Sequence, residues 1–162
     1  MMYNFVLDSD ALIKLANAGI LSIVCSSLNC CITSAVEQET VHEGKNRLYP
    51  DAEIIEYLIK NGMLKVKNPK KIVSGEFFGG GELSVWSLAK ENKNHVVVSD
   101  DQKFIKYLER EGIDFVVPAD MLLILRKTNK ISLKEALFYL GKIKVFIKEE
   151  VYKSVKKELE EG

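Results

Sequence analysis

The chain has 162 residues, with 23 basic and 23 acidic side chains and a formal net charge of zero. This length fits one domain with a helical appendage and is enough to bury about 70% of the surface of the unfolded chain. A hydrophobic content of 47% argues against disorder, and zero net charge excludes binding of nucleic acid by bulk charge alone.

Apolar runs and turn residues divide the chain into alternating strands and helices. The predicted strands are residues 3–7, 30–33, 63–66, 95–98 and 113–117. The predicted helices between them are residues 11–17, 20–26, 34–44, 50–60, 82–90 and 104–112. Residues 67–81 are predicted to form a loop. After residue 117 only helical patterns occur, over residues 119–127, from Ser132 onward and over residues 147–160.

This alternation predicts an α/β fold with a central, mostly parallel sheet of four to five strands sandwiched by helices. We assign residues 1–117 to this core and residues 118–162 to a helical C-terminal extension packed on it. No apolar run approaches the ~18 residues that span a membrane, and no signal peptide is visible. We therefore expect a cytoplasmic protein without membrane contact.

Acidic residues follow several of the predicted strands. Asp8 follows the first strand and Asp100 and Asp101 follow the fourth, while Glu39 lies one turn into the helix after the second strand. Glu82 opens the helix after three glycines. Because sites in parallel α/β folds form at the carboxyl ends of strands, we expect these acids to share one edge. Like charges there repel, and an all-oxygen set favours Mg²⁺ or Mn²⁺ as the counter-ion.

Each acid also has a purely structural interpretation. Asp8 also fits the N-cap of the first helix, although Ser9 or Asp10 suits that role too and is the predicted cap. One of Asp100 and Asp101 is expected to be a cap while the other is functional. Glu39 also fits a solvent-facing helix position, and Glu82 fits simple complementarity to a helix N-terminus.

Four segments, in this order, resemble the PIN-domain family over roughly residues 3–117. They are residues 6–13, 34–39, 81–89 and 97–104. The resemblance implies a metal-dependent ribonuclease fold. It implies catalytic acids at Asp8, Glu39, Glu82 and Asp101, and metal ligands at Asp8, Glu82, Asp101 and Asp100. Ser9, Asp10 and Ser99 are then supporting residues.

Residues 118–162 resemble the tail of an uncharacterised prokaryotic branch of PIN-like proteins, and the third acid is Glu where many toxins have Asp. The implied activity is hydrolysis of single-stranded RNA with Mg²⁺ or Mn²⁺, in a toxin of a toxin–antitoxin pair. An antitoxin protein and a second copy of the chain are the expected partners. Phosphate contacts are assigned to Lys65, Lys67, Lys70 and Lys71, and a solvated surface is their plainer interpretation.

Two other functions stay open. Residues 8–10 and 99–101, with Thr33 ending a strand, also fit a haloacid-dehalogenase-like phosphatase, although Leu12 departs from its pattern. A non-catalytic PIN-like scaffold that binds a partner through its tail helix is the other alternative. The clustered cysteines Cys25, Cys30 and Cys31 are expected to be buried thiols rather than disulfides or zinc ligands.

Overall fold

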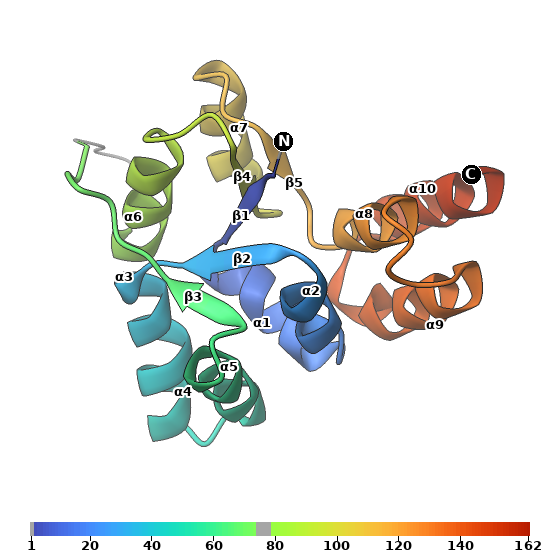
Figure 1. Ribbon diagram of the computed structural model, residues 1–162, viewed down its shortest axis with the longest axis horizontal. Helices are drawn as coiled ribbons and strands as arrows, with labels where there is room; N and C mark the ends of the chain where they lie inside the picture. Colours follow the sequence, from blue (N-terminus) through green and yellow to red (C-terminus); the bar gives the residue numbers. More distant parts are fainter. Residues whose placement is uncertain (1, 74–78) are drawn as a thin grey trace.

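The computed structural model describes residues 2–73 and 79–162 and contains a five-stranded parallel sheet (Figure 1). The strands are β1 (Asn4–Leu7), β2 (Asn29–Ile32), β3 (Leu64–Val66), β4 (His95–Val98) and β5 (Phe115–Val116). Their order is β3-β2-β1-β4-β5, and every neighbouring pair is parallel. The predicted α/β fold is confirmed. β1 is central because its apolar residues are covered on both faces.

Helices pack on both faces of this sheet (Figure 1). They are α1 (Ser9–Asn17), α2 (Leu21–Ser27), α3 (Ser34–Glu37), α4 (Glu43–Asn46), α5 (Pro50–Lys60), α6 (Gly80–Ala89) and α7 (Gln102–Arg110). The face that bears His95 is covered by α6, whose Leu88 carbonyl oxygen lies 2.8 Å from the Nδ1 atom of His95. We call it the α6 face. On the opposite face, Cys30 of β2 contacts Cys25 of α2.

Residues 34–46 form an interrupted helix rather than the regular helix predicted there. A five-residue π-helical segment, Gln38–His42, separates α3 from α4. Such segments are rare and occur often at functional sites, because the extra residue shifts the side chains around the helix axis. Glu39 lies on this segment.

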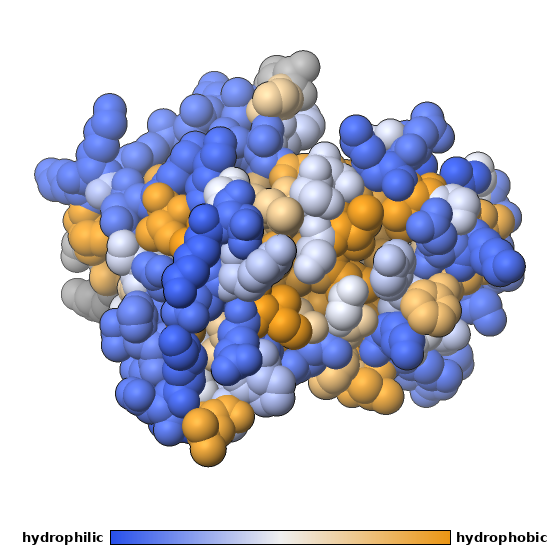
Figure 2. Space-filling view, turned by 60° about the horizontal axis from the view of Figure 1, so that its bottom comes forward, coloured by the Kyte–Doolittle hydropathy of each residue, from blue (hydrophilic) through white to orange (hydrophobic). Residues whose placement is uncertain are grey.

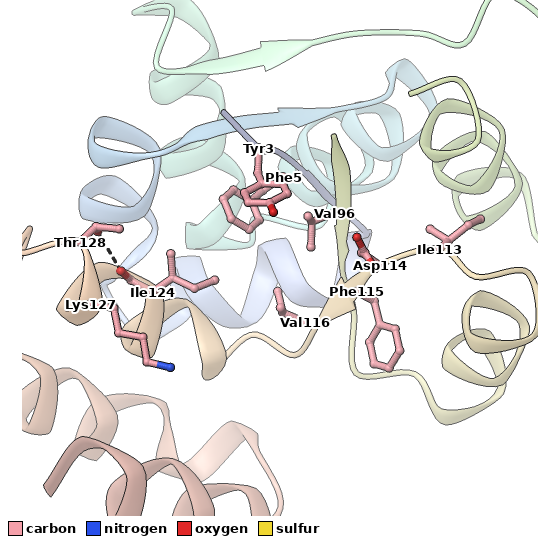
Figure 3. A pocket seen from close by; sticks show the side chains of 10 residues that line it. All are labelled: Tyr3, Phe5, Val96, Ile113, Asp114, Phe115, Val116, Ile124, Lys127 and Thr128. Atoms are coloured by element: carbon pink, nitrogen blue, oxygen red, sulfur yellow. Dashed lines mark hydrogen bonds between the residues drawn. The ribbon is translucent and has the colours of Figure 1, made fainter. Parts of the chain in front are cut away.

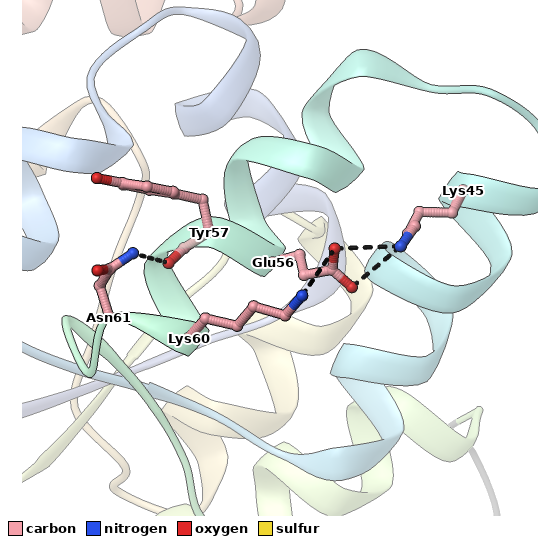
Figure 4. Close-up of polar contacts among 5 residues, drawn as sticks. All are labelled: Lys45, Glu56, Tyr57, Lys60 and Asn61. Carbon is pink, nitrogen blue, oxygen red and sulfur yellow. Dashed lines mark hydrogen bonds and ion pairs between the residues drawn. The ribbon is translucent and has the colours of Figure 1, made fainter.

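An ion-pair network joins α4 to α5 on the surface (Figure 4). The two carboxylate oxygens of Glu56 accept from the Lys45 ammonium at 3.1 and 3.2 Å, and Lys60 lies 3.7 Å away. These neighbouring ammonium groups hold the pKa of Glu56 below its usual range. Asn61 then ends α5 by donating its amide to the carbonyl of Tyr57 at 2.8 Å.

The same two helices lie close together at Gly44, where a side chain has no room. A Cβ atom there would lie 2.9 Å from the Cβ of Ala52, which has no rotamer to move into. We expect Gly44→Ala to destabilise the protein by about 1–3 kcal/mol through overpacking. Denaturant unfolding measures this, with Gly141→Ala as the control because nothing lies within 4 Å of that position. Equal stability of the two variants would contradict the close approach.

Three further helices follow the sheet, namely α8 (Asp120–Lys127), α9 (Leu133–Ile143) and α10 (Glu149–Glu161). A capping box starts α9, in which Ser132 and Glu135 each bond the other's backbone N–H. Leu125, Leu140 and Val155 belong to the same buried cluster as the strands. α8 contacts α2 and α9 contacts α1, so these helices pack on the side of the sheet away from α6 (Figure 1).

The surface combines charged and apolar regions. Figure 2 shows one face on which hydrophobic residues gather in a central band between hydrophilic ones. Within the described ranges, no single helix is long and apolar enough to cross a membrane; α1 and α2 meet that test only together, as a pair bent by 112°. The predicted loop 67–81 lies partly outside the described residues, and β5 is shorter than predicted because only Phe115 and Val116 pair with β4.

Candidate active site

Asp8 lies directly at the carboxyl end of β1 and is 4% exposed. One of its carboxylate oxygens accepts from the backbone N–H of Ala11 at 2.9 Å, and the side chain of Ser99 also bonds to it. Asp8 is thus the N-cap of α1, and the prediction that Ser9 or Asp10 would cap this helix is wrong. The strand leaves residue 8 extended and the helix starts immediately at residue 9, so only residue 8 has cap geometry.

Glu39 reaches the same edge from the π-helical segment. Its Oε2 atom accepts from the Ser9 hydroxyl at 2.6 Å, which links the helix after β2 to the first residue of α1. Its carboxylate lies against Gly81 in the first turn of α6, where a Cβ atom would be 3.0 Å from the Glu39 Cδ atom and overlap Oε1. Glu39 is exposed, as its solvent-facing interpretation expects, and the contacts with Ser9 and Gly81 hold its carboxylate at this edge.

The two aspartates after β4 have different partners. Asp101 caps α7, since its Oδ1 atom accepts from the Phe104 N–H at 2.8 Å, and its own N–H donates to the Ser99 hydroxyl at 3.2 Å. Asp100 forms a half-buried ion pair with Lys14 of α1. Lys14 is therefore part of the site, although the sequence analysis did not single it out.

The charges at this edge act on one another. Burial raises the pKa of Asp8 to about 7, and the charges of Asp10 and Asp100 add to this effect. Burial also raises the pKa of Glu82, together with the charges of Asp101, Asp10 and Glu39. The acids predicted to share one edge are thus close enough to perturb one another.

The carboxylate oxygens of these acids nevertheless do not form one compact cluster. Within residues 2–73 and 79–162, no three Asp, Glu, His or Cys side chains are close enough to hold one metal ion together. The donor chemistry still suits a hard divalent cation, because all the groups are carboxylates or hydroxyls. Asp8 is the strongest indication, since a buried carboxylate with a raised pKa gains most from a nearby cation. Asp8, Glu82 and Asp101 would hold such an ion, in part through water.

The hydroxyls of Thr33 and Ser84, which the sequence analysis did not assign to this site, stabilise it. Thr33 Oγ1 and Ser84 Oγ lie 2.6 Å apart, and the Ser84 hydroxyl is 2.7 Å from the carbonyl oxygen of Gly81. Thr33 also accepts from the N–H of Val36. The chain of bonds fixes the first turn of α6, which carries Glu82, against the start of α3. The signal in the sequence was a threonine at the end of a strand, where caps are common.

The predicted phosphate-binding lysines lie elsewhere. Lys65 is in β3, and Lys67, Lys70 and Lys71 are in the segment that follows it. The charges that perturb Asp8 and Glu82 come from other residues.

An apolar hollow of about 560 Å³ is also separate from the acidic edge (Figure 3). It lies on the face opposite α6, where Phe5, Val96 and Val116 form its floor and Ile124 of α8 forms a wall. None of the predicted acids lines it. The acidic edge and this hollow are thus separate features of the surface.

The five-stranded parallel sheet and the carboxylates gathered at its carboxyl edge define an α/β protein of the nuclease-like type. A family model described as a PIN domain matches residues 4–161, and the chain belongs to the PIN-domain family. The resemblance predicted from the sequence is confirmed over nearly the whole chain. PIN domains are generally nucleases that use divalent metal ions. None of the curated proteins compared with the chain matches it.

The contact between Gly81 and Glu39 makes a specific prediction. Gly81→Ala is expected to push the Glu39 carboxylate away from Ser9, and to reduce nuclease activity by roughly 10- to 100-fold, as loss of a supporting contact at a metal site does. The control is Gly80→Ala, because nothing lies within 4 Å of that position in the same helical turn. Cleavage rates of the two variants decide the matter, and equal rates would show that the position of Glu39 is unimportant.

Proposed function

We propose that this protein hydrolyses phosphodiester bonds in single-stranded RNA with the help of Mg²⁺ or Mn²⁺. The buried Asp8 carboxylate carries the proposal, because it lies at the carboxyl end of β1 beside other acids and burial raises its pKa to about 7. A protein keeps such a group at a cost in stability, and this combination is typical of functional sites. The family supports a nuclease in general, and RNA and the metal are the added inference.

The residues have distinct roles in this proposal. Asp8, Glu82 and Asp101 would hold the ion, and Glu39, which lies against Gly81 beside Glu82, would position the attacking water. Ser9 fixes the Glu39 carboxylate, and Ser99 holds both Asp8 and the backbone of Asp101. When bound, a divalent ion lowers the pKa of a water ligand and offsets negative charge on the phosphate.

Cleavage of end-labelled single-stranded RNA tests this proposal. The wild-type protein is expected to cut in Mn²⁺ or Mg²⁺ and to stop on addition of EDTA, while Asp8→Asn is expected to be inactive. Equal cleavage by both proteins would identify a contaminating nuclease and contradict the proposal.

The same observations bear on the phosphatase, the toxin and the non-catalytic scaffold. The family match favours a nuclease over a haloacid-dehalogenase-like phosphatase, and Thr33 is engaged by Ser84 and Val36. The toxin role, the antitoxin partner, the homodimer and the cytoplasmic location stay predictions. A non-catalytic scaffold becomes the better explanation if the cleavage assay fails with correctly folded protein.

A further inference from the structure

The α6 face of the sheet is only partly covered. α6 contacts β1 and β4, whereas Cys31 of β2 and Lys65 of β3 are paired in register on the same face beyond it. The chain after β3 then crosses toward α6. The Lys67 N–H donates to the carbonyl of Ile32 at 2.8 Å, and the Lys70 N–H donates to Glu91 Oε2 at 2.6 Å.

Two cavities have Lys67 in their lining. One, of about 270 Å³, lies at the amino ends of β2 and β3, and its polar lining is Asn4, Ser26, Ser27, Asn29, Lys65 and Lys67. The polar lining of the other, of about 560 Å³, is Lys67, Asn68, Lys70, Glu91, Asn92 and His95. Because they share Lys67, we call the two cavities together the Lys67 groove. Ammonium and amide groups outnumber its one carboxylate, that of Glu91.

The cations of this groove are not neutralised. Among the described residues, Lys65, Lys67 and Lys70 have no carboxylate within 4.0 Å of their ammonium groups, in contrast to Lys14, Lys45 and Lys127. Other surface lysines in the described part of the chain are also unpaired, but here three of them line one groove. Glu91 bonds the Lys70 backbone rather than its ammonium group. Three unpaired cations along one groove attract a polyanion.

The effect of Lys65 and Lys67 on the pKa of the buried Cys31 thiol gives independent support for the position of their ammonium groups. Burial raises the pKa of the Cys31 thiol to about 11, and the charges of Lys67 and Lys65 act in the opposite direction. Both ammonium groups are therefore close enough to the floor of the groove to exert their field there.

We infer that the Lys67 groove binds the sugar–phosphate backbone of single-stranded RNA. This inference rests on the proposed function for its ligand and adds a second contact surface to it. Among the described residues that line the groove there is no Phe, Tyr or Trp on which a base could stack, so binding is expected to be independent of base sequence. Lysine, as a point charge without a planar fork, suits phosphate contacts rather than base readout.

The groove and the acidic edge lie toward opposite ends of α6. Gly81 contacts Glu39 at the start of this helix, and Leu88 lines the groove near its end. Ten helical residues span about 15 Å, so an extended strand can occupy both sites at once. The groove would then hold the RNA a few nucleotides away from the bond that is cut.

Binding can be measured separately from cleavage. The test uses the Asp8→Asn protein in EDTA and a fluorescein-labelled oligouridylate of about 15 nucleotides, followed by anisotropy over a range of salt concentrations. In this background Lys65→Gln, Lys67→Gln and Lys70→Gln are combined. The matched control combines Lys153→Gln, Lys156→Gln and Lys157→Gln in α10, which removes the same charge from an exposed helix far from the groove.

The groove variant is expected to bind at least about tenfold more weakly, and the slope of log K against log salt should fall by about 2, since each phosphate contact contributes roughly 0.7. The control should change the affinity less than about twofold. Equal weakening of both variants would show bulk charge binding, and unchanged affinity would show that the groove is not used. Equally tight binding of inorganic polyphosphate would overturn RNA as the specific ligand. Because no cleavage is measured, these outcomes are independent of the nuclease proposal.

Discussion

Replacing Asp8 with asparagine is expected to stabilise the metal-free protein at pH 8 and to abolish RNA cleavage. Asparagine keeps an oxygen that can accept from the Ala11 N–H, so the cap of α1 is preserved. It removes a buried negative charge whose pKa in the folded protein is about 7, against 3.8 for an exposed aspartate. That difference corresponds to a cost of up to about 4 kcal/mol when the group is ionised.

The direction of the pH dependence follows from the raised pKa. The folded protein favours the protonated carboxyl, so the contribution of Asp8 to stability is complete below pH 3.8 and is lost progressively up to about pH 7. Wild type should therefore lose stability relative to Asp8→Asn between pH 5 and pH 8. Urea unfolding of both proteins in EDTA at pH 5 and pH 8 measures this change in the free energy of unfolding. In a thermal melt the same change corresponds to roughly 10 °C in Tm.

Two controls separate this effect from a general change of charge. Asp10→Asn removes the same charge from an exposed neighbour and should alter the free energy of unfolding by less than about 0.5 kcal/mol. Adding Mn²⁺ at about 100 times its Kd should stabilise wild type by about 2.7 kcal/mol and leave Asp8→Asn unchanged. A variant that is less stable than wild type at pH 8 would show that Asp8 is chiefly structural.

The second large effect is expected at Asp101, whose carboxylate both caps α7 and belongs to the acidic edge. Asp101→Asn should retain the bond to the Phe104 N–H and so keep α7 intact, yet lose roughly 100-fold in cleavage rate through loss of the charge beside Glu82. Asp101→Ala should lose the same activity and also about 1 kcal/mol of stability, because the cap is removed.

The pair of variants thus separates two functions of one side chain. Cleavage rates and denaturant unfolding are measured for both. The control is Asp120→Asn, because Asp120 also accepts from a backbone N–H, that of Val117, and the charges that act on it are those of Glu158 and Lys127. Full activity in Asp101→Asn would assign the residue to capping alone and direct attention to Asp100.

Parts of the site could be predicted because they depend on local sequence. An apolar run that is followed by an acid, directly as at Asp8 or within three residues as at Asp101, places a carboxylate near the end of a strand whatever the rest of the chain does. The resemblance to the PIN-domain family identified the same positions. The residue that caps α1 was predicted wrongly because three successive polar residues, 8–10, all suit that role, and only the backbone angles select Asp8.

Other parts could not be predicted because they join distant segments. Lys14 and Asp100 are 86 residues apart, Thr33 and Ser84 are 51 apart, and Ser9 and Glu39 are 30 apart. The hydrophobic periodicity of a sequence does not indicate which distant residues form such pairs. The π-helical segment under Glu39 is equally hidden, since its sequence suits a regular α-helix and packing of α4 against α5 accompanies the irregular turn.

The sequence by itself determined the alternation of strands and helices, the family and the type of side chain at each strand end, because these follow from hydrophobic period and local motifs. Only the tertiary structure decided how the charges are arranged. With β1 between β2 and β4, Asp8 is buried beside Ser99, where the charges of Asp10 and Asp100 act on it. The net charge of zero is therefore the sum of an acidic edge and a basic groove. Charged side chains interact only over short distances in salt solution, and the fold sets the distances between them.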